Sequence, residues 1–439
     1  MIILHILGGI VMNKKKILII SFDAVDGNDL NFLCTLPHFS SILKESSYSK
    51  EVETIYPSLT YPAHTSIVTG MNPKNHGVIN NIKVQPNRCN SSDWFWEKKE
   101  VKVESLFDIA KRNGLTCSSI LWPVSCKANI KYNMPEVFAN RKWQNQIITS
   151  ALNGSISYQF NLNNKFSHLR NGINQPELDN YTINCFLHTL REYDADVMFL
   201  HLTDVDTTRH KFGYDSEEAK YALRRHDSRL GEIISRLKLL DIFDDTTLIL
   251  LGDHSMINTH SVIKLNNLFL DKAWLTLTKD NKNIDSWEVY LNTCDGAAYI
   301  YFKDKHNKTL LNKVIATLNK FSNENDNCIK EILTSEEAEK LGADPNCTLM
   351  LEAKKGYYFI NDFTAPTIEN TDGKYDKATH GYNPSQYDNG TFFMIKDKSV
   401  KKNFNIGPMR IIDEAPTISK IMGETLLDVD GRVLHKIFL

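Results

Sequence analysis

Three short apolar segments of this chain are each followed within a few residues by acidic residues. The segments and the residues that follow them are 17–22 with Asp23, 196–202 with Asp204 and Asp206, and 246–251 with Asp253 and His254. Continuous apolar runs of this length, rich in β-branched residues, are typical of strands that a parallel sheet buries on both faces. Because parallel strands end at the same edge of a sheet, we expect these acidic side chains to lie close together.

Helical patterns alternate with these segments, for example at residues 104–113 and 216–240. The alternation predicts an α/β fold with a parallel sheet covered by helices on both faces. The 439 residues exceed what one hydrophobic core ordinarily holds, so we expect a second lobe. We predict a core at residues 13–254 and 377–439, with an insertion at about 127–180, and a smaller α+β cap lobe inserted at 255–376.

Charge and cysteine content limit the partners and the location of the chain. A formal net charge of −2 gives no long-range attraction to nucleic acid, so we expect no nucleic-acid polymer as a partner. No segment reaches the roughly 20 apolar residues of a membrane span. The apolar start is short and its lysines follow it, so we favour a start of translation at Met12 over one at Met1. With eight scattered cysteines, we expect a cytoplasmic protein; the oligomeric state is open.

Thr60 stands where a helix is predicted to begin. The next residues are Tyr61 and Pro62, and the helical pattern closes at Gly70. A hydroxyl at the first turn of a helix lies beside free backbone N–H groups, which favour negative charge and can bind a phosphoryl oxygen. An isolated threonine at such a place is usually only a helix cap.

Five further positions carry side chains of types that bind metal ions. Asp206 and His210 are four residues apart and share one face of a helix, Asp253 and His254 follow a strand, and His380 lies in a predicted loop. Each of these features is unremarkable by itself. Together with Asp23 and Thr60, they predict a metal site at the edge of the sheet. Carboxylates and imidazoles suit Zn²⁺, with Mn²⁺ or Fe as alternatives.

In their order along the chain, these residues resemble the alkaline phosphatase superfamily and, within it, the nucleotide pyrophosphatase/phosphodiesterase branch. The resemblance extends to residues 66–78, to residues 121–123 and to residues 411–431. It implies an alkaline phosphatase-like sandwich with two divalent metal ions. Asp23, Thr60, Asp253 and His254 would hold one ion, and Asp206, His210 and His380 the other. Thr60 would be the nucleophile that is transiently phosphorylated, and Asn81 would donate to a phosphate oxygen.

The activity that follows is metal-dependent hydrolysis of phosphodiester or pyrophosphate bonds in a small molecule, through a phosphothreonine. The neutral Asn81 fits a singly charged diester better than a phosphomonoester, which is an alternative substrate. Where nucleotide-binding members carry a stacking tyrosine after the asparagine, this chain has Ile82, Lys83 and Val84. A phosphonate hydrolase, similar to phosphonoacetate hydrolase, is the nearest rival; Lys83, Lys127 or Lys211 could bind its substrate. An alternative of another class is a non-catalytic metal-binding module.

Overall fold

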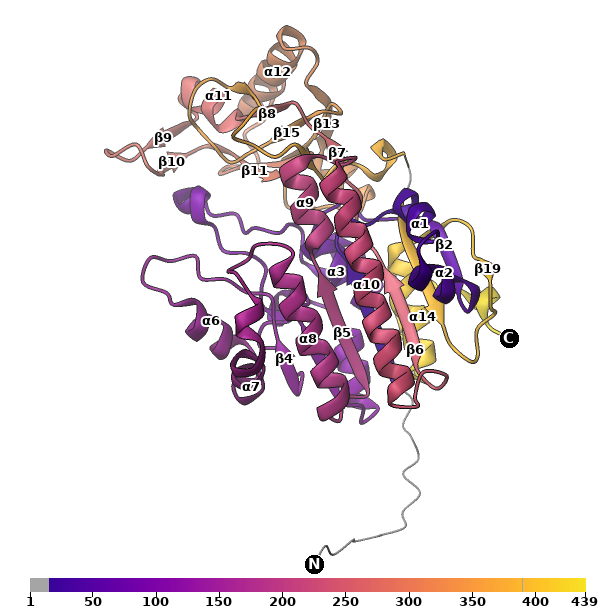
Figure 1. Ribbon diagram of the computed structural model, residues 1–439. Helices are drawn as coiled ribbons and strands as arrows, with labels where there is room; N and C mark the ends of the chain where they lie inside the picture. Colours follow the sequence, from indigo (N-terminus) through magenta and orange to yellow (C-terminus); the bar gives the residue numbers. More distant parts are fainter. Residues whose placement is uncertain (1–15, 389) are drawn as a thin grey trace, which may run out of the picture.

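The computed structural model describes residues 16–388 and 390–439, so the predicted start at Met12 lies outside the described residues. A large lower lobe and a smaller upper lobe make up this part of the chain (Figure 1). A nine-stranded sheet runs through the lower lobe. Its strands, in spatial order, are β19 (Phe404–Asn405), β2 (Ser47–Glu53), β18 (Thr391–Lys396), β6 (Thr247–Leu251), β1 (Ile17–Phe22), β5 (Val197–Leu202), β3 (Cys117–Ile120) and β4 (Tyr132–Met134), with β20 (Met409–Arg410) beside β2.

The five strands from β6 to β4 are parallel, as predicted. The sheet as a whole is mixed, because β18 runs antiparallel to both β6 and β2. At this edge the predicted parallel sheet thus carries an antiparallel strand that the sequence did not indicate. The chain returns to the lower lobe beside the carboxyl end of β6, and from there a strand can only run back toward the other end of the sheet.

Apolar residues of β1 point alternately to the two faces of the sheet. Leu18, Ile20 and Phe22 join a core with one set of helices, and Ile17 and Ile19 join a core with another. The first set is α1 (Gly27–Leu33), α2 (Pro37–Lys44), α7 (Ile156–Phe166), α8 (Glu177–Glu192) and α10 (Glu217–Leu239). The second set is α3 (Thr60–Thr69), α5 (Leu106–Arg112) and α14 (Glu414–Ile421). The sheet is thus covered by helices on both faces, as the sequence predicts (Figure 1).

The upper lobe has its own apolar core and a four-stranded antiparallel sheet. The sheet order is β11 (Val289–Cys294), β12 (Ala297–Phe302), β14 (Leu349–Ala353) and β13 (Ile329–Thr334). Around it lie β8 (Ser261–Ile263), α11 (Leu265–Asp271), β9 (Leu275–Leu277), β10 (Ile284–Trp287), α12 (Lys308–Glu324), α13 (Ser335–Lys340), β15 (Tyr357–Phe359) and β16 (Ile368–Asn370).

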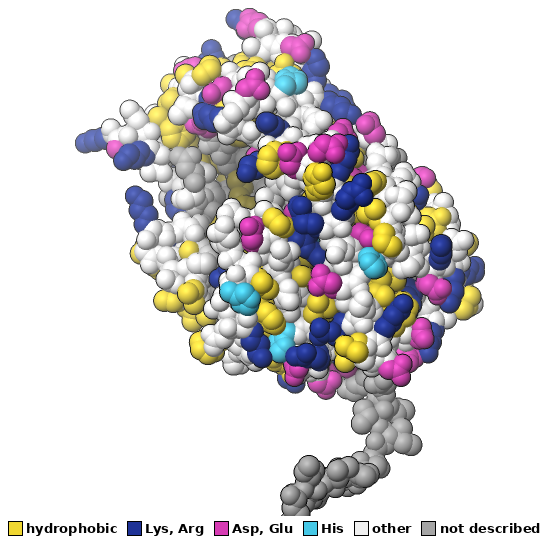
Figure 2. All heavy atoms as spheres, in the orientation of Figure 1, with side chains coloured by type: hydrophobic (Ala, Val, Ile, Leu, Met, Phe, Trp, Pro, Cys, Tyr) yellow, Lys and Arg dark blue, Asp and Glu magenta, His cyan; other side chains and the backbone are white. Residues whose placement is uncertain are grey.

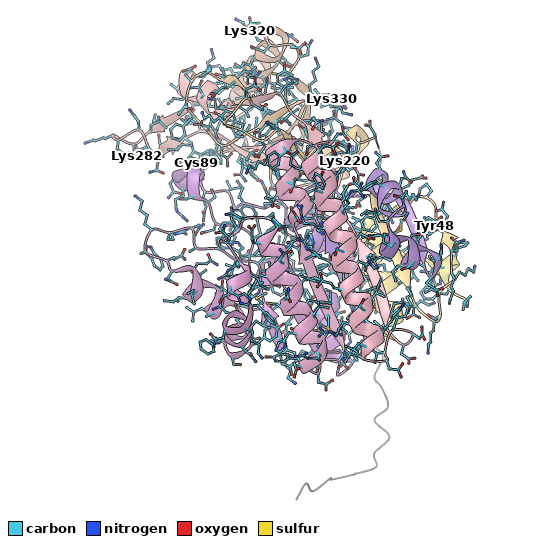
Figure 3. The ribbon with its side chains drawn as sticks, in the orientation of Figure 1. Tyr48, Cys89, Lys220, Lys282, Lys320 and Lys330 are labelled. Atoms are coloured by element: carbon cyan, nitrogen blue, oxygen red, sulfur yellow. The ribbon has the colours of Figure 1, made fainter. Side chains whose placement is uncertain are left out.

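Two short strands form a neck where the chain enters and leaves the upper lobe. β7 (Ile257–Asn258) pairs antiparallel with β17 (Ala378–Thr379), so Ile257 lies opposite Thr379. A loop of the lower lobe also reaches across, because Cys89 belongs to the apolar core of the upper lobe (Figure 3). The exact limits of core, insertion and cap lobe stay a prediction. No helix in the described residues is long and apolar enough to cross a membrane.

Candidate active site

Asp23, Thr60, Asp253 and His254 meet at the carboxyl edge of the central strands. Asp23 follows β1, Asp253 and His254 follow β6, and Thr60 is the first residue of α3. His254 Nε2 lies 3.1 Å from the Thr60 hydroxyl oxygen, 3.3 Å from Asp23 Oδ1 and 3.2 Å from Asp253 Oδ2. One nitrogen and three oxygens thus converge on a small volume.

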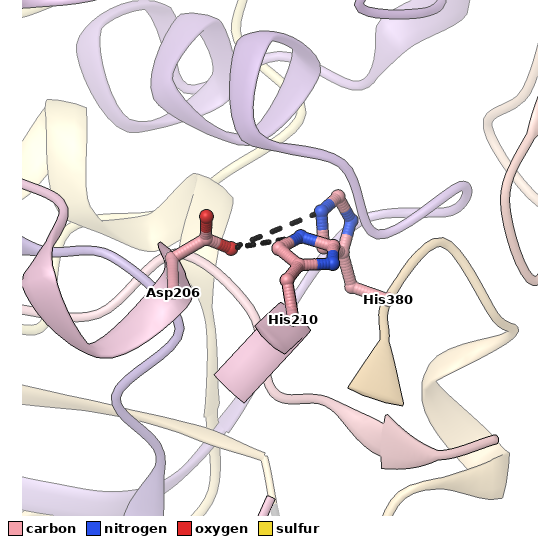
Figure 4. A group of neighbouring side chains, drawn as sticks. All are labelled: Asp206, His210 and His380. Atoms are coloured by element: carbon pink, nitrogen blue, oxygen red, sulfur yellow. Dashed lines mark ion pairs between the residues drawn. The ribbon is translucent and has the colours of Figure 1, made fainter. Parts of the chain in front are cut away.

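Asp206, His210 and His380 form a second group (Figure 4). Asp206 and His210 lie one turn apart on α9 (Asp204–Phe212), and Asp206 Oδ1 is 3.4 Å from His210 Nε2. His380 directly follows β17, and its Nε2 lies 4.0 Å from the same carboxylate oxygen. The antiparallel neck therefore returns the histidine to the edge at which β6 ends.

The two groups are neighbours. The rings of His254 and His380 stack with centroids 4.0 Å apart and an interplanar angle of 23°. All seven positions that the sequence predicts as metal ligands therefore lie close together. Their roles as ligands stay a prediction.

The residues present fit a pair of metal ions. Asp23 Oδ1, Asp206 Oδ1 and Asp253 Oδ2 are buried and have no hydrogen-bond partner. Unpaired buried carboxylate oxygens are costly, and a cation would satisfy them. Tetrahedral Zn²⁺ with bonds of about 2.0–2.1 Å places neighbouring ligand atoms about 3.3 Å apart, which matches the spacing around His254 Nε2.

Burial and negative neighbours raise the pKa of the carboxyl groups beside Thr60. The pKa of Asp23 rises to about 7, through burial first and the charge of Asp206 second. Burial and then the charge of Asp23 raise the pKa of Asp253 well above its ordinary value. Carboxylates crowded in this way hold their charge best beside cations.

Two histidines of the pocket, His254 and His380, are held in the neutral form that binds metals. Burial and the neighbouring His380 lower the pKa of His254 well below its ordinary value. Burial and His210 lower the pKa of His380 to about 4. Neutral imidazole is the ligating form, so both rings can coordinate at neutral pH without losing a proton.

Asn81 is held beside Thr60 by a hydrogen bond from the backbone of α3. Its Oδ1 accepts a hydrogen bond of 2.9 Å from the backbone N–H of Tyr61. One of the backbone N–H groups at the start of α3 is thus engaged with Asn81 and positions its side chain. With the amide oxygen engaged, the NH₂ group is the end of Asn81 that can donate to a phosphate oxygen.

Two residues behind Asp23 were not predicted. His201, in β5, lies 3.0 Å from Asp23 Oδ2 through its Nε2 and 3.2 Å from Glu136 Oε2 through its Nδ1. Glu136 also accepts from the Tyr61 hydroxyl at 3.0 Å. A histidine inside the otherwise apolar strand was the one signal in the sequence; Glu136 gave none.

A cavity of about 900 Å³ opens from these groups, and Figure 2 shows the surface hollowed between the two lobes. Thr60, Asn81, Asp206, His210 and His380 line it. Another part of the lining, called the α6–α7 wall below, comes from α6 (Gln146–Asn153), α7 and the segment up to Leu178.

Comparison with known proteins decides the family. A model of the type I phosphodiesterase / nucleotide pyrophosphatase family matches residues 17–383. The chain belongs to this family. Its predicted branch of the alkaline phosphatase superfamily and its class, a hydrolase of phosphodiester or pyrophosphate bonds, are confirmed.

Relatives of this phosphodiesterase are distant. Bis(5'-adenosyl)-triphosphatase ENPP4 of Pongo abelii is 22% identical over 93% of this chain and 78% of its own length. Ectonucleotide pyrophosphatase/phosphodiesterase family member 1 of Homo sapiens is 27% identical over 53% of this chain and 23% of its own. Murine ENPP5, solved as an inactive variant in complex with AMP, has a TM-score of 0.67 at 19% identity and covers 97% of this chain and 100% of its own. This likeness confirms the predicted fold class.

The lysines considered for a phosphonate substrate lie elsewhere in this phosphodiesterase. Lys83 pairs with Glu100 at 2.7 Å, and Lys127 pairs with Glu97 at 2.8 Å. Lys211 lies over the ring of Phe212. None of the three lysines lines the cavity in the described part of the chain, so nothing in the site favours a phosphonate hydrolase.

Proposed function

We propose that this phosphodiesterase attacks its substrate with the Thr60 hydroxyl and holds two divalent cations. Zn²⁺ is the cation we propose, with Mn²⁺ or Fe as alternatives. One observation carries the proposal: the Thr60 oxygen lies 3.1 Å from His254 Nε2, inside the donor group of Asp23, Asp253 and His254.

Two such cations, once bound, supply positive charge that stabilises oxygen anions and lowers the pKa of a nearby hydroxyl. The Thr60 oxygen then forms a bond to phosphorus, the bond from phosphorus to the leaving oxygen breaks, and the alcohol product carries away the hydroxyl proton. One water hydrolyses the phosphothreonine, which restores the Thr60 hydroxyl and releases a phosphomonoester. Asn81 donates from its NH₂ group to a phosphate oxygen, which is electrostatic stabilisation.

The charges around the cavity favour a diester with one negative charge. Arg170 is the one lysine or arginine among the described residues that line the cavity, and it belongs to the segment that follows α7. Among the described residues that line the cavity, no second arginine or lysine is available to balance the dianion of a monoester. We therefore propose a phosphodiester rather than a phosphomonoester as the substrate.

This proposal predicts a marked preference in hydrolysis. We expect bis-p-nitrophenyl phosphate to be turned over faster than p-nitrophenyl phosphate, and EDTA to abolish both activities. Metal analysis of the purified protein should find two ions per chain. Turnover that survives complete removal of metal would contradict the proposal.

The nucleophile is tested separately. Thr60→Ala should lower kcat by at least about 10³-fold, because the hydroxyl that forms the covalent intermediate is lost. The metal content should stay near that of the parent protein, since six donors remain. A variant that keeps both its metals and its turnover would exclude Thr60 as the nucleophile.

A further inference from the structure

Exposed apolar side chains are concentrated in one short stretch of this chain. Fourteen large hydrophobic residues are exposed in the described residues, and seven of them lie between positions 143 and 173. These seven are Trp143, Ile147, Ile148, Leu152, Ile156, Phe160 and Ile173. Single exposed apolar residues need no explanation, but a cluster of this kind marks a binding surface.

The cluster lies on the segment just before α6, on α6 and α7, and on the loop that follows them, at the side of the lower lobe in Figures 1 and 2. None of the residues of α6 is buried, although the helix is amphipathic. Stability of the fold therefore does not explain why these positions are apolar.

Part of the cluster faces the catalytic cavity. Ile147, Ile156, Phe160 and Ile173 line the same cavity of about 900 Å³ as Thr60. Their side chains are 67%, 60%, 66% and 79% exposed, so a bound molecule has much apolar surface to cover. A substrate whose phosphorus lies at Thr60 can reach this wall without leaving the cavity.

Charge along the same wall is scarce. Among the cavity-lining residues from 146 to 178, Arg170 is the one charged side chain. A polyphosphate leaving group needs several cationic or N–H partners, and this wall does not supply them. A neutral, apolar group fits the wall better.

We infer that the wall formed by α6, α7 and the loop to Leu178 binds a hydrocarbon chain, so that the substrate is an amphiphilic phosphodiester with an alkyl or acyl tail. The inference rests on the proposed phosphodiesterase function and names the part of the substrate that does not react. Burial of each CH₂ group against these residues increases kcat/KM by up to about fourfold.

Esters of graded chain length test the inference. Methyl, butyl and octyl p-nitrophenyl phosphate are compared below their critical micelle concentrations, so that only monomers are present. We expect kcat/KM to be at least about 50-fold higher for the octyl than for the methyl ester.

Substitutions in the α6–α7 wall test where the dependence of kcat/KM on chain length arises. Phe160→Ser and Ile156→Ser should each lower the octyl-to-methyl ratio several-fold, and the double variant by at least about tenfold. Ile148→Ser is the matched control, because Ile148 is 59% exposed on α6 but does not line the cavity; it should keep the parent ratio. All three side chains are exposed, so the variants should fold.

The possible results distinguish a failure of the hydrocarbon site from a failure of the phosphodiesterase function on which it rests. No turnover of the methyl ester would contradict the phosphodiesterase proposal itself. Turnover of the methyl ester with a flat chain-length series would overturn only the hydrocarbon site, as would equal effects of Ile148→Ser and Phe160→Ser. Faster turnover of thymidine 5'-monophosphate p-nitrophenyl ester than of the octyl ester would also overturn it. Calorimetric titration of Thr60→Ala with octyl methyl phosphate gives a readout without turnover: binding supports the site, and no binding overturns it.

Discussion

The two oxygens of Asp23 have different partners. Oδ2 lies 3.0 Å from His201 Nε2, whereas Oδ1 faces His254 at 3.3 Å and has no hydrogen bond. His201 is itself held through Nδ1 by Glu136 and by the carbonyl of Leu121 at 3.1 Å. The ring thus orients Asp23 so that one oxygen points into the pocket. Partners that orient a metal ligand in this way commonly matter nearly as much as the ligand.

His201→Phe should therefore weaken metal binding about 10- to 100-fold, because Asp23 loses the group that orients it. His201→Gln keeps a donor near the position of Nε2 and should retain most of the affinity. Competition titration with a chromophoric chelator measures the affinity, and the melting temperature in EDTA reports on folding alone. Equal metal affinity in the parent and in His201→Phe would contradict the positioning role.

His76 makes stability depend on pH. Burial lowers its pKa from 6.5 to about 3. Its Nδ1 accepts from the backbone N–H of Val78 at 3.1 Å, and its Nε2 lies 3.1 Å from the Ser66 hydroxyl, so the ring fits only when neutral. The unfolded chain takes up a proton below about pH 6.5 and the folded chain does not. Stability is therefore lost as the pH falls through this range.

Between pH 7 and pH 5, this residue should cost about 2 kcal/mol of unfolding free energy, at about 1.4 kcal/mol per pH unit below 6.5. His76→Gln should remove this contribution to the loss of unfolding free energy between pH 7 and pH 5, although the variant is less stable than the parent at pH 7. His306→Gln, at an exposed position, is the control and should leave the pH dependence unchanged. Urea unfolding at both pH values provides the comparison, and identical pH slopes for His76→Gln and the parent would contradict the argument.

At the scale of elements, the loop after β17 fixes His380. The Gly381 N–H donates to the Ser58 carbonyl at 2.9 Å, and the Gly296 N–H donates to the His380 carbonyl at 2.8 Å. Gly381 has φ +86°, and a Cβ there would lie 1.8 Å from the Cys294 carbonyl oxygen. The loop can pass this closely only because the residue has no side chain.

Gly381→Ala should lower the unfolding free energy by more than about 2 kcal/mol, since backbone strain and a steric clash add. It should also weaken the binding of one metal ion, because His380 is displaced. Gly373→Ala is a matched control: its φ is +75°, but nothing lies within 4 Å of a Cβ, so we expect a loss of about 1 kcal/mol. Thermal unfolding and metal titration of both variants distinguish the backbone strain, which both share, from the steric clash with the Cys294 carbonyl, which only Gly381→Ala has. Equal losses of unfolding free energy in the two variants would contradict the close approach of this loop to Cys294.

The sequence predicts those features that depend on local pattern. Asp23 and Asp253 follow from buried strands that end at one edge, and Asp206 with His210 follows from helical spacing. His380 is different, because only the pairing of β7 with β17 brings it back, and no periodicity reveals a two-residue ladder between distant segments. Glu136 and the antiparallel direction of β18 escaped prediction for the same reason: both depend on contacts across the fold.

At the scale of the whole molecule, the pocket joins segments from nearly the full length of the chain. Asp23 lies near the start of the described residues and His380 follows the upper lobe in the chain, and both line one cavity. Buried oxygens without partners weaken the fold at this place. Cations that bind only the folded chain should therefore stabilise the whole molecule.

Removal of metal should lower the melting temperature clearly. At free metal concentrations of about 100 to 1,000 times Kd, each ion should add about 2.7–4.1 kcal/mol to the unfolding free energy. Calorimetry with EDTA, and again after Zn²⁺ is restored, measures the effect. Asp206→Asn weakens only the group of Asp206, His210 and His380, so it should lose part of the metal-dependent increase in melting temperature. A melting temperature that is the same with and without EDTA would contradict the two-cation assignment.

The neck of β7 and β17 has a consequence for the history of this protein. Entry and exit of the upper lobe lie side by side at this neck, and the lobe also packs against Tyr56 and Leu59 of the lower lobe. Sequence changes in the upper lobe can alter the part of the substrate cavity that this lobe lines. The pairing of β7 with β17 meanwhile keeps His380 beside His254. Substrate choice can thus diverge between relatives whose reaction chemistry stays the same.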